Sequence, residues 1–135
     1  MSSDENDASP GSGLKIETNS SHVEPTRLEI PGAEGVFHIQ ILNEDRGRGV
    51  VTTIVHLAPG ARIPAHRHRA GSEMHYVFEG DLIENGRVLE VGSFLTHAAG
   101  QVHGPHESRG GARVLTVQDW QSQNGQFDFE PVEQD

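Results

Sequence analysis

The chain contains no cysteine among its 135 residues. It therefore has no disulfide framework and no thiolate chemistry, and any metal that it binds must be held by nitrogen and oxygen atoms. Long apolar runs are absent as well: no segment approaches the roughly 18 apolar residues of a membrane-spanning helix. The first residues are acidic and polar, without the apolar stretch of a secretory signal, so we expect a cytoplasmic protein with no membrane partner.

Basic residues are scarce. Ten lysines and arginines stand against 20 aspartates and glutamates, which gives a formal net charge of −10 when the histidines are neutral. A surface of this sign repels the phosphates of nucleic acids and of anionic membranes, so neither is an expected partner. The length allows one domain with a genuine core and leaves no room for a second.

A helical period of apolar residues is missing too, and short apolar runs ended by turn residues take its place. We predict a flexible acidic tail at 1–24, a β domain at 25–130 and a C-terminal tail at 131–135. Asn85-Gly86 is the strongest hairpin signal, because this pair suits a type I′ turn. Antiparallel strands of a sandwich or barrel are predicted at 27–30, 36–42, 50–57, 66–68, 73–79, 81–84, 87–90, 93–96, 102–106 and 112–120, and around Phe127 and Phe129.

What the chain does have is a group of histidines beside a carboxylate. His66 and His68 are two residues apart, and Glu73 follows five residues later. On a strand, residues i and i+2 point to the same face, so both imidazoles project into the same space. The segment from Glu73 reads as the next strand, and we expect it to pair with the histidine strand. Imidazoles and a carboxylate in one pocket are usual ligands of a divalent transition metal, whereas a bare His-x-His pair also occurs in exposed loops.

Two segments together resemble the paired motifs of the cupin superfamily. The first runs from Gly60 to Gly80: glycine, five residues, His-x-His, four residues, glutamate, six residues, glycine. The second begins at Gly92 and continues with five residues, a usual proline, one residue, glycine, two residues and His103. The chain departs from the second motif at Ala98, where the family usually has proline, and at Glu107, where it usually has asparagine.

The resemblance covers about 50–117 and implies an all-β, cupin-type antiparallel β-barrel, also called a jelly roll. It further implies one divalent metal per chain held by His66, His68, Glu73 and His103. Three imidazoles and one carboxylate suit Fe(II), Mn(II), Ni(II), Cu(II) or Zn(II), and we favour Fe(II). Since diketone-cleaving cupins use three histidines with a glutamate nearby, Glu73 is either a ligand or an acceptor behind one. Many cupins pair, so we expect a homodimer.

The runs His66–Glu73 and His103–Ser108 are similar to those of a subgroup with diketone-cleaving dioxygenases and the cupin domain of certain anti-sigma factors. We predict an Fe(II)-dependent dioxygenase that cleaves a C–C bond of a small diketone-like or enolisable substrate. One alternative is a non-catalytic metal- or ligand-sensing module. Another is a metal-dependent isomerase or lyase on a sugar or keto acid, with His75 as its acid or base. The other interpretation of His75 is a hydrogen-bonded barrel histidine.

The remaining histidines and arginines of these segments are predicted near the surface. We expect His97 and His106 to lie at the rim. Arg62, Arg67 and Arg69 form a positive cluster in the sequence. At the mouth of the barrel this cluster would steer an anionic substrate, and the alternative is that these are solvated loop charges.

Overall fold

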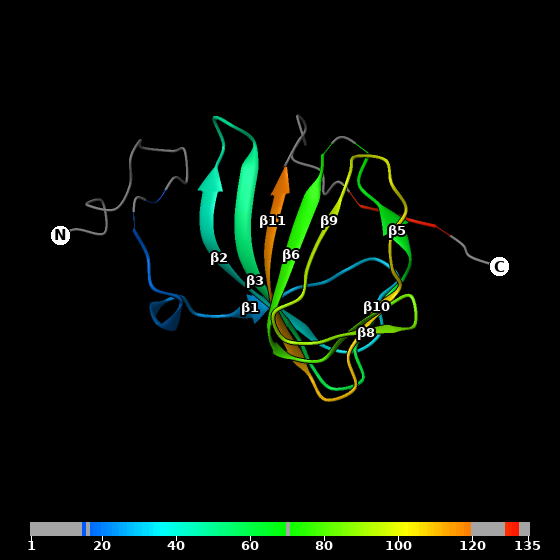
Figure 1. Ribbon diagram of the computed structural model, residues 1–135. Coiled ribbons are helices and arrows are strands. Elements are labelled where there is room, and N and C mark those ends of the chain that lie inside the picture. Colours follow the sequence, from blue (N-terminus) through cyan, green and yellow to red (C-terminus); the bar gives the residue numbers. More distant parts are fainter. Residues whose placement is uncertain (1–14, 16, 70, 120–128, 133–135) are drawn as a thin grey trace.

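The computed structural model describes residues 15, 17–69, 71–119 and 129–132. Within them every regular element is a β-strand, apart from the short 3-10 turn η2 at Ser20–His22. This arrangement confirms the predicted all-β antiparallel class (Figure 1). The strands are β1 Thr26–Arg27, β2 Phe37–Asp45, β3 Val50–Leu57, β4 Arg62–Ile63, β5 His66–Arg67, β6 Glu73–Gly80, β7 Leu82–Glu84, β8 Arg87–Leu89, β9 Phe94–His97, β10 His106–Glu107, β11 Ala112–Asp119 and β12 Glu130–Pro131.

The strands form three antiparallel sheets. The largest has six strands in the order β1-β2-β3-β11-β6-β9, the second has four in the order β4-β10-β7-β8, and β12 pairs with β5. In Figure 1 the six-stranded sheet forms one wall of the molecule, and β5, β8 and β10 lie opposite it. Because β11 returns between β3 and β6, segments far apart in the sequence meet in one sheet.

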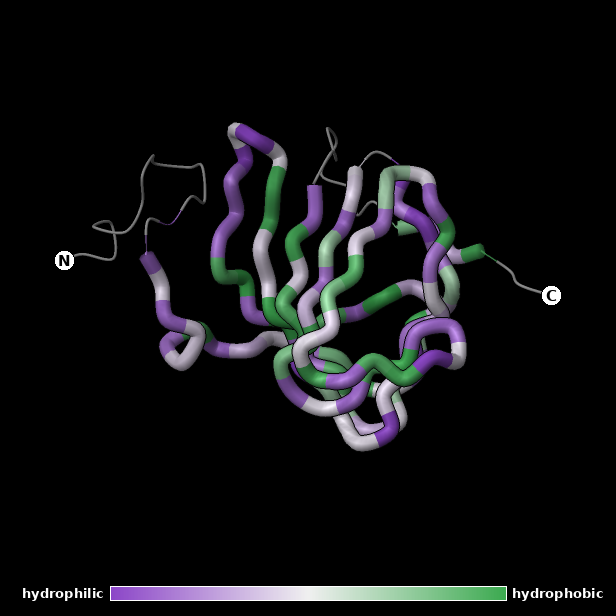
Figure 2. Tube along the Cα trace, in the orientation of Figure 1, coloured by the Kyte–Doolittle hydropathy of each residue, from purple (hydrophilic) through white to green (hydrophobic). Residues whose placement is uncertain are grey.

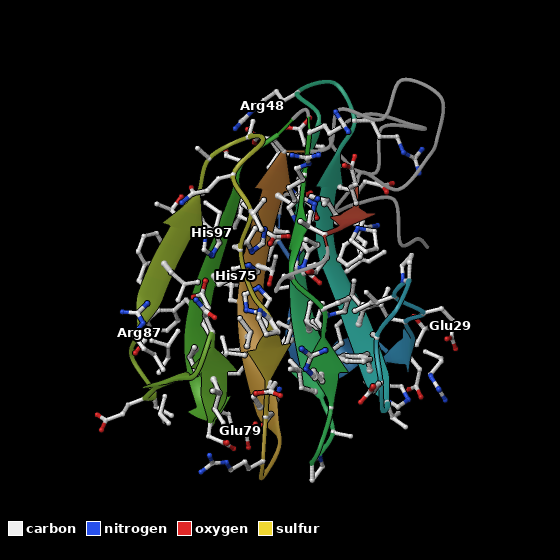
Figure 3. The ribbon with its side chains drawn as sticks, turned by 90° about the vertical axis from the view of Figure 1, so that its right-hand side faces the viewer. Glu29, Arg48, His75, Glu79, Arg87 and His97 are labelled. Carbon is white, nitrogen blue, oxygen red and sulfur yellow. The ribbon has the colours of Figure 1, made fainter. Side chains whose placement is uncertain are left out.

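The space between the sheets is filled from alternating strand positions. On β6, Glu73 and Val77 are buried while Met74 and Tyr76 are exposed, as the two-residue period of a strand requires. Hydrophobic segments lie along the strands in Figure 2. Figure 3 shows that titratable groups share this interior: His75 and His97 lie between the sheets, whereas Glu79 and Arg87 lie at the periphery. The apolar core cluster consists of Phe37, Leu57, Ala61, Val77, Leu82, Ala112 and Val114.

The predicted hairpin is confirmed, but one predicted strand pairing is wrong. Asn85 and Gly86 join β7 to β8 with φ values of 47° and 82°, both positive as a type I′ turn requires. The histidine strand β5, however, does not pair with β6. Both edges of β6 are already paired, with β11 and with β9, so β5 pairs with β12 instead. Glu73 therefore reaches the histidines from the large sheet, across the interior.

Parts of both predicted tails contact the β domain. The side-chain amide of Gln40 on β2 donates to the carbonyl oxygens of Ser20 and Val23, each at 2.8 Å. The backbone N–H of Val132 donates to the carbonyl oxygen of Ala65 at 2.8 Å. The rest of these tails, 1–14, 16 and 133–135, lies outside the described residues, as does Phe127. No helix in the described part of the chain is long and apolar enough to span a membrane.

Candidate metal centre

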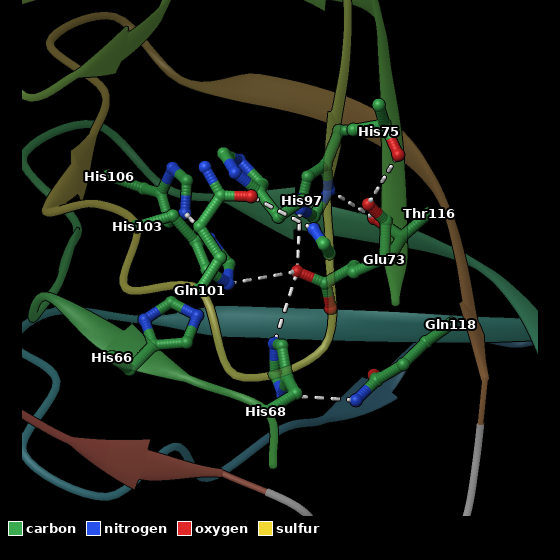
Figure 4. A network of polar contacts seen from close by, with 12 residues as sticks. His66, His68, Glu73, His75, His97, Gln101, His103, His106, Thr116 and Gln118 are labelled. Carbon is green, nitrogen blue, oxygen red and sulfur yellow. Dashed lines mark hydrogen bonds and ion pairs between the residues drawn. The ribbon is translucent and has the colours of Figure 1, made fainter. Parts of the chain in front are cut away.

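The structure brings together the four residues that the two motifs single out. His66 lies on β5, His68 just beyond it, Glu73 begins β6, and His103 precedes β10. All four are buried, and one ligand atom from each lies within 4.8 Å of the others (Figure 4). The two segments are joined at the backbone, because His66 and His103 exchange N–H···O hydrogen bonds of 2.9 Å in both directions.

The Glu73 carboxylate lies close to three imidazoles. Its Oε1 lies 3.2 Å from His68 Nε2, 3.9 Å from His103 Nε2 and 2.7 Å from His75 Nε2. Burial alone would raise the pKa of this carboxyl, but the nearby charge of His75 and hydrogen bonds from His68 and His75 hold the pKa well below its usual range. Glu73 is therefore an ionised carboxylate in an otherwise imidazole-rich site.

The buried imidazoles are in the form that binds metals. Burial lowers the pKa of His66 to about 4 and that of His103 to about 2, so both are neutral at pH 7. A neutral imidazole carries one lone pair, which is the ligand form. His103 Nε2 is buried and has no hydrogen-bond partner among the described residues. Three imidazoles, two of them shown to be neutral, and one carboxylate fit a divalent transition metal.

Contacts behind the ligands orient their rings. His66 Nδ1 donates to the carbonyl oxygen of Pro64 at 2.7 Å, which leaves the lone pair of Nε2 available to a metal. His68 Nδ1 lies 3.2 Å from the side-chain amide of Gln118, a group that can offer either an oxygen or a nitrogen. His103 Nδ1 lies 3.1 Å from His106 Nε2.

His75 lies behind Glu73 and on the wall of the interior cavity. Its Nε2 lies 2.7 Å from Glu73 Oε1 and its Nδ1 lies 3.1 Å from the hydroxyl of Thr116. The ring is half-buried. Both ring nitrogens therefore have partners, and the residue also lines the cavity. Both contacts agree with the interpretation of His75 as a hydrogen-bonded histidine, and its role as an acid or base stays a prediction.

The prediction that His97 and His106 lie at the rim is wrong. They are only 8% and 4% exposed. The His97 ring stacks on that of His103, with centroids 3.9 Å apart, and its Nε2 lies 3.2 Å from Glu84 Oε1. If the predicted strand 93–96 had been extended by one residue, its two-residue period would have placed His97 on the same inward face as Leu95. His106 offered no comparable signal, because glycine and proline precede it.

A cavity of about 300 Å³ opens beside the candidate metal ligands. His66, His68 and Glu73 form part of its wall, and His75, His106, Thr116 and other polar groups stand near them. Among the described residues that line it there is no lysine or arginine. Its remaining wall is mainly aliphatic, from Leu28, Ile30, Ile39, Ile41, Val51, Val55, Leu57, Ile63, Leu82 and Val114.

None of the three arginines lines the cavity and each is paired with a carboxylate, which favours the alternative that they are solvated loop charges. Arg62 lies 3.3 Å from Glu107, and Arg67 donates to Glu130 at 2.6 Å. Arg69 donates to the same carboxylate at 2.9 Å. The two arginines that share Glu130 help to hold β12 against β5, whereas the pair of Arg62 with Glu107 joins β4 to β10.

The C-terminal strand also covers one ligand. The Phe129 ring stacks on the ring of His66, with centroids 4.3 Å apart and an interplanar angle of 23°. Phe129 lines the cavity as well. An apolar ring on this side of His66 keeps water away from the candidate ligands.

Comparisons with known proteins agree with this fold. The model of one protein family, described as ChrR cupin-like domain, matches residues 20–123. A search of curated proteins finds no match to the chain.

Solved structures are similar in fold at low sequence identity. The polyketide cyclase RemF from Streptomyces resistomycificus has a TM-score of 0.67 and 20% identity, covering 88% of this chain and 86% of that one. A putative acetylacetone dioxygenase from Methylibium petroleiphilum PM1 has a TM-score of 0.66 and 14% identity, covering 87% and 85%. A predicted oxalate decarboxylase from Thermotoga maritima has a TM-score of 0.65 and 19% identity, covering 76% and 96%. These likenesses, at 20% identity or less, confirm the predicted cupin fold and do not by themselves establish the reaction.

Proposed function

The chain belongs to the ChrR cupin-like family, and on that premise we propose that it is a metal-dependent dioxygenase. Its substrate is a small, mainly apolar diketone or enolisable compound, and its metal is Fe(II). One observation carries the proposal: four buried donors lie within 4.8 Å of one another, and three of them line an aliphatic cavity of about 300 Å³. The acetylacetone dioxygenase among the structural neighbours supports the choice of reaction class.

His66, His68, Glu73 and His103 would hold the metal. A bound Fe(II) would supply Lewis acidity toward substrate oxygens and the capacity to react with O2. The aliphatic walls hold the apolar part of the substrate and exclude water. An enolisable substrate must lose a proton, and the side chain placed to accept it would be His75, which lines the cavity and is hydrogen-bonded to Glu73 at 2.7 Å.

The lining of the cavity favours this substrate class over sugars and keto acids. Sugar hydroxyls need many polar partners, and carboxylates are usually bound by arginine or lysine. The described lining residues include no such cation, and ten of them are aliphatic, including Ile39, Val55 and Leu57. An isomerase or lyase acting on those substrates is therefore the less supported alternative.

A sensing module is the second candidate, and the number of donors favours it. Four protein donors complete the tetrahedral shell of Zn(II), as in structural zinc sites that leave no open position. The same four donors around Fe(II), which accepts more ligands, leave room for substrate. The identity of the bound metal therefore separates the two candidates.

The test is metal content and O2 consumption on one sample loaded anaerobically with Fe(II). Small β-diketones such as acetylacetone are added to the wild type, to His103→Ala and to His22→Ala, a matched control whose side chain is exposed on η2. We expect O2 uptake that requires both iron and diketone, disappears in His103→Ala and persists in His22→Ala. Stoichiometric metal without O2 uptake would leave the sensing module as the better candidate. A wild-type chain that binds no metal would overturn both.

A further inference from the structure

We propose that His106 sets the tautomer of His103 and thereby makes that residue a metal ligand. The inference rests on the metal site proposed above, but it concerns a side chain outside the four ligands. His106 is 4% exposed and takes no part in the steps described so far. It is a positioning residue, since it acts through His103.

The contact between the two rings is a hydrogen bond between imidazoles. His103 Nδ1 lies 3.1 Å from His106 Nε2, and the ring planes make an angle of 63°. A neutral imidazole has one N–H and one lone pair, so one ring must donate and the other accept. Two arrangements satisfy this condition. Only one of them, in which His103 donates from Nδ1, leaves the lone pair on His103 Nε2.

That lone pair lies on the side of the proposed metal. His103 Nε2 is 3.9 Å from Glu73 Oε1 and is buried without a hydrogen-bond partner among the described residues. In the opposite tautomer Nε2 would carry a proton, which would compete with the metal for the same position. The direction of the His103–His106 hydrogen bond therefore decides whether His103 can bind a metal.

Both rings are held in place by the backbone. His103 is bridged to His66, and His106 on β10 is paired with Ile63 on β4 and with Glu84 on β7. The arrangement parallels the one at His66, whose Nδ1 donates to the carbonyl oxygen of Pro64 at 2.7 Å. A carbonyl can only accept, which fixes that tautomer. Metal-binding histidines usually have such an acceptor behind them, and at His103 the imidazole of His106 supplies it.

The first test reads the tautomer directly in the metal-free wild-type protein. Long-range 1H–15N NMR correlations distinguish a protonated Nδ1 from a protonated Nε2 in each histidine ring. We expect the proton of His103 on Nδ1 and a lone pair on His106 Nε2. A His103 protonated on Nε2 overturns the inference. Since no metal is needed, this result is independent of whether the proposed function holds.

The second test compares Zn(II) affinities, measured by competition with a chromophoric chelator. His106→Leu removes the acceptor, whereas His106→Gln offers an amide oxygen in its place. We expect His106→Leu to weaken Zn(II) binding about 10- to 100-fold, and His106→Gln to stay within a few-fold of wild type. The matched control is His56→Leu, which breaks the 2.7 Å contact of His56 with Gln40 away from the site and should leave the affinity unchanged.

Three results of this second test would overturn the inference. One is native affinity in His106→Leu. The second, which holds even if His106→Leu does not fold, is loss of Zn(II) binding in a His106→Gln protein of wild-type stability. The third is two zinc ions per wild-type chain and one per His106→Gln chain. His106 would then be a ligand itself, in the group His75, His103 and His106, whose ligand atoms also lie within 4.8 Å of one another.

Discussion

At the residue scale, Glu73 connects the candidate ligands to the cavity. Its Oε1 contacts nitrogens of His68 and His75, and it lines the cavity. Its carboxylate supplies the only negative charge among the four donors, which favours a divalent cation in the same space.

The first prediction is that Glu73→Gln weakens metal binding by about 100-fold, because the amide is a poorer ligand and carries no charge. The measurement is the dissociation constant for Zn(II) and Fe(II) at pH 7. Glu79→Gln is the matched control, since Glu79 lies on the same strand but is exposed and paired with Arg113. Equal affinities in both variants would mean that Glu73 does not ligate and only accepts a hydrogen bond.

Much of the candidate site could be predicted from the sequence, because the spacing of residues along one strand determines which side chains share a face. The i, i+2 spacing of His66 and His68 was sufficient to place both rings in one space, and their centroids are 5.1 Å apart. His106 could not be found in this way. Its burial depends on pairing with β4 and β7, which come from distant parts of the sequence. The alternation of residues along a single strand does not indicate which other strands will pair with it.

At the scale of elements, the two glycines that bracket the first motif differ in their surroundings. Gly60 and Gly80 both have φ of +84°, a conformation that costs a side chain about 1–2 kcal/mol. Around Gly60 there is no heavy atom within 4 Å of an added Cβ. At Gly80 the added Cβ would collide with the carbonyl oxygen of Gly111 and lie 2.8 Å from Ala112 Cα.

The second prediction follows from this pair. Gly60→Ala should lower the free energy of unfolding by about 1 kcal/mol, and Gly80→Ala by about 3 kcal/mol or more, because overpacking adds to the backbone strain. Urea unfolding of the metal-free proteins measures both values. Equal losses would contradict the close approach of β6 and β11 at Gly80.

The third prediction concerns β12. Glu130→Gln should release β12 from Arg67 and Arg69, uncover His66 and speed the removal of bound zinc by a chelator a few-fold. In the wild type, hydrogen bonds from Arg69 and Arg67 lower the pKa of Glu130 to about 2, so this contact is at full strength above pH 4.5 and is lost only as the pH falls toward 2.

Glu79→Gln again serves as the control for β12, because it breaks an exposed ion pair that does not involve this strand. Added salt should speed zinc release from the wild type and have less effect on Glu130→Gln, since exposed ion pairs are screened. Identical release rates in all three proteins would contradict a covering role for β12.

Strand positions could largely be predicted from the sequence, whereas strand partners could not. The predicted runs 50–57 and 73–79 match β3 and β6 to within a residue, because the two-residue period and the turn residues are local signals. The expected pairing of β5 with β6 was wrong, since which edges are free depends on where β11 and β12 return.

At the scale of the whole molecule, the buried histidines make stability depend on pH. Burial lowers the pKa of His66 from 6.5 to about 4, and it lowers the pKa of His106 well below 6.5. Below pH 6.5 the unfolded chain takes up protons that the folded chain resists. The contribution of these groups to stability is therefore full above pH 6.5 and is lost as the pH falls toward 4.

The fourth prediction is that the metal-free protein loses free energy of unfolding between pH 6.5 and 4, by at most about 1.4 kcal/mol per pH unit for each such histidine. Urea unfolding at several pH values measures this slope. His66→Gln should reduce it, while His22→Ala, at an exposed position, should not. A flat profile over this range would contradict the burial of neutral imidazoles.

The aliphatic lining of the cavity and the candidate metal ligands come from different strands. The aliphatic lining residues Ile39, Ile41, Val51, Val55 and Leu57 lie on β2 and β3, and these strands carry none of the candidate metal ligands. Substitutions on β2 and β3 can therefore reshape the cavity while the segments that carry the candidate metal ligands stay unchanged. The shape of the cavity can therefore be changed by mutation without changing the candidate metal ligands. If the proposed function holds, a library restricted to Ile39, Ile41, Val51 and Val55, which lie outside the core cluster, would vary the compound that binds and leave the candidate metal ligands intact.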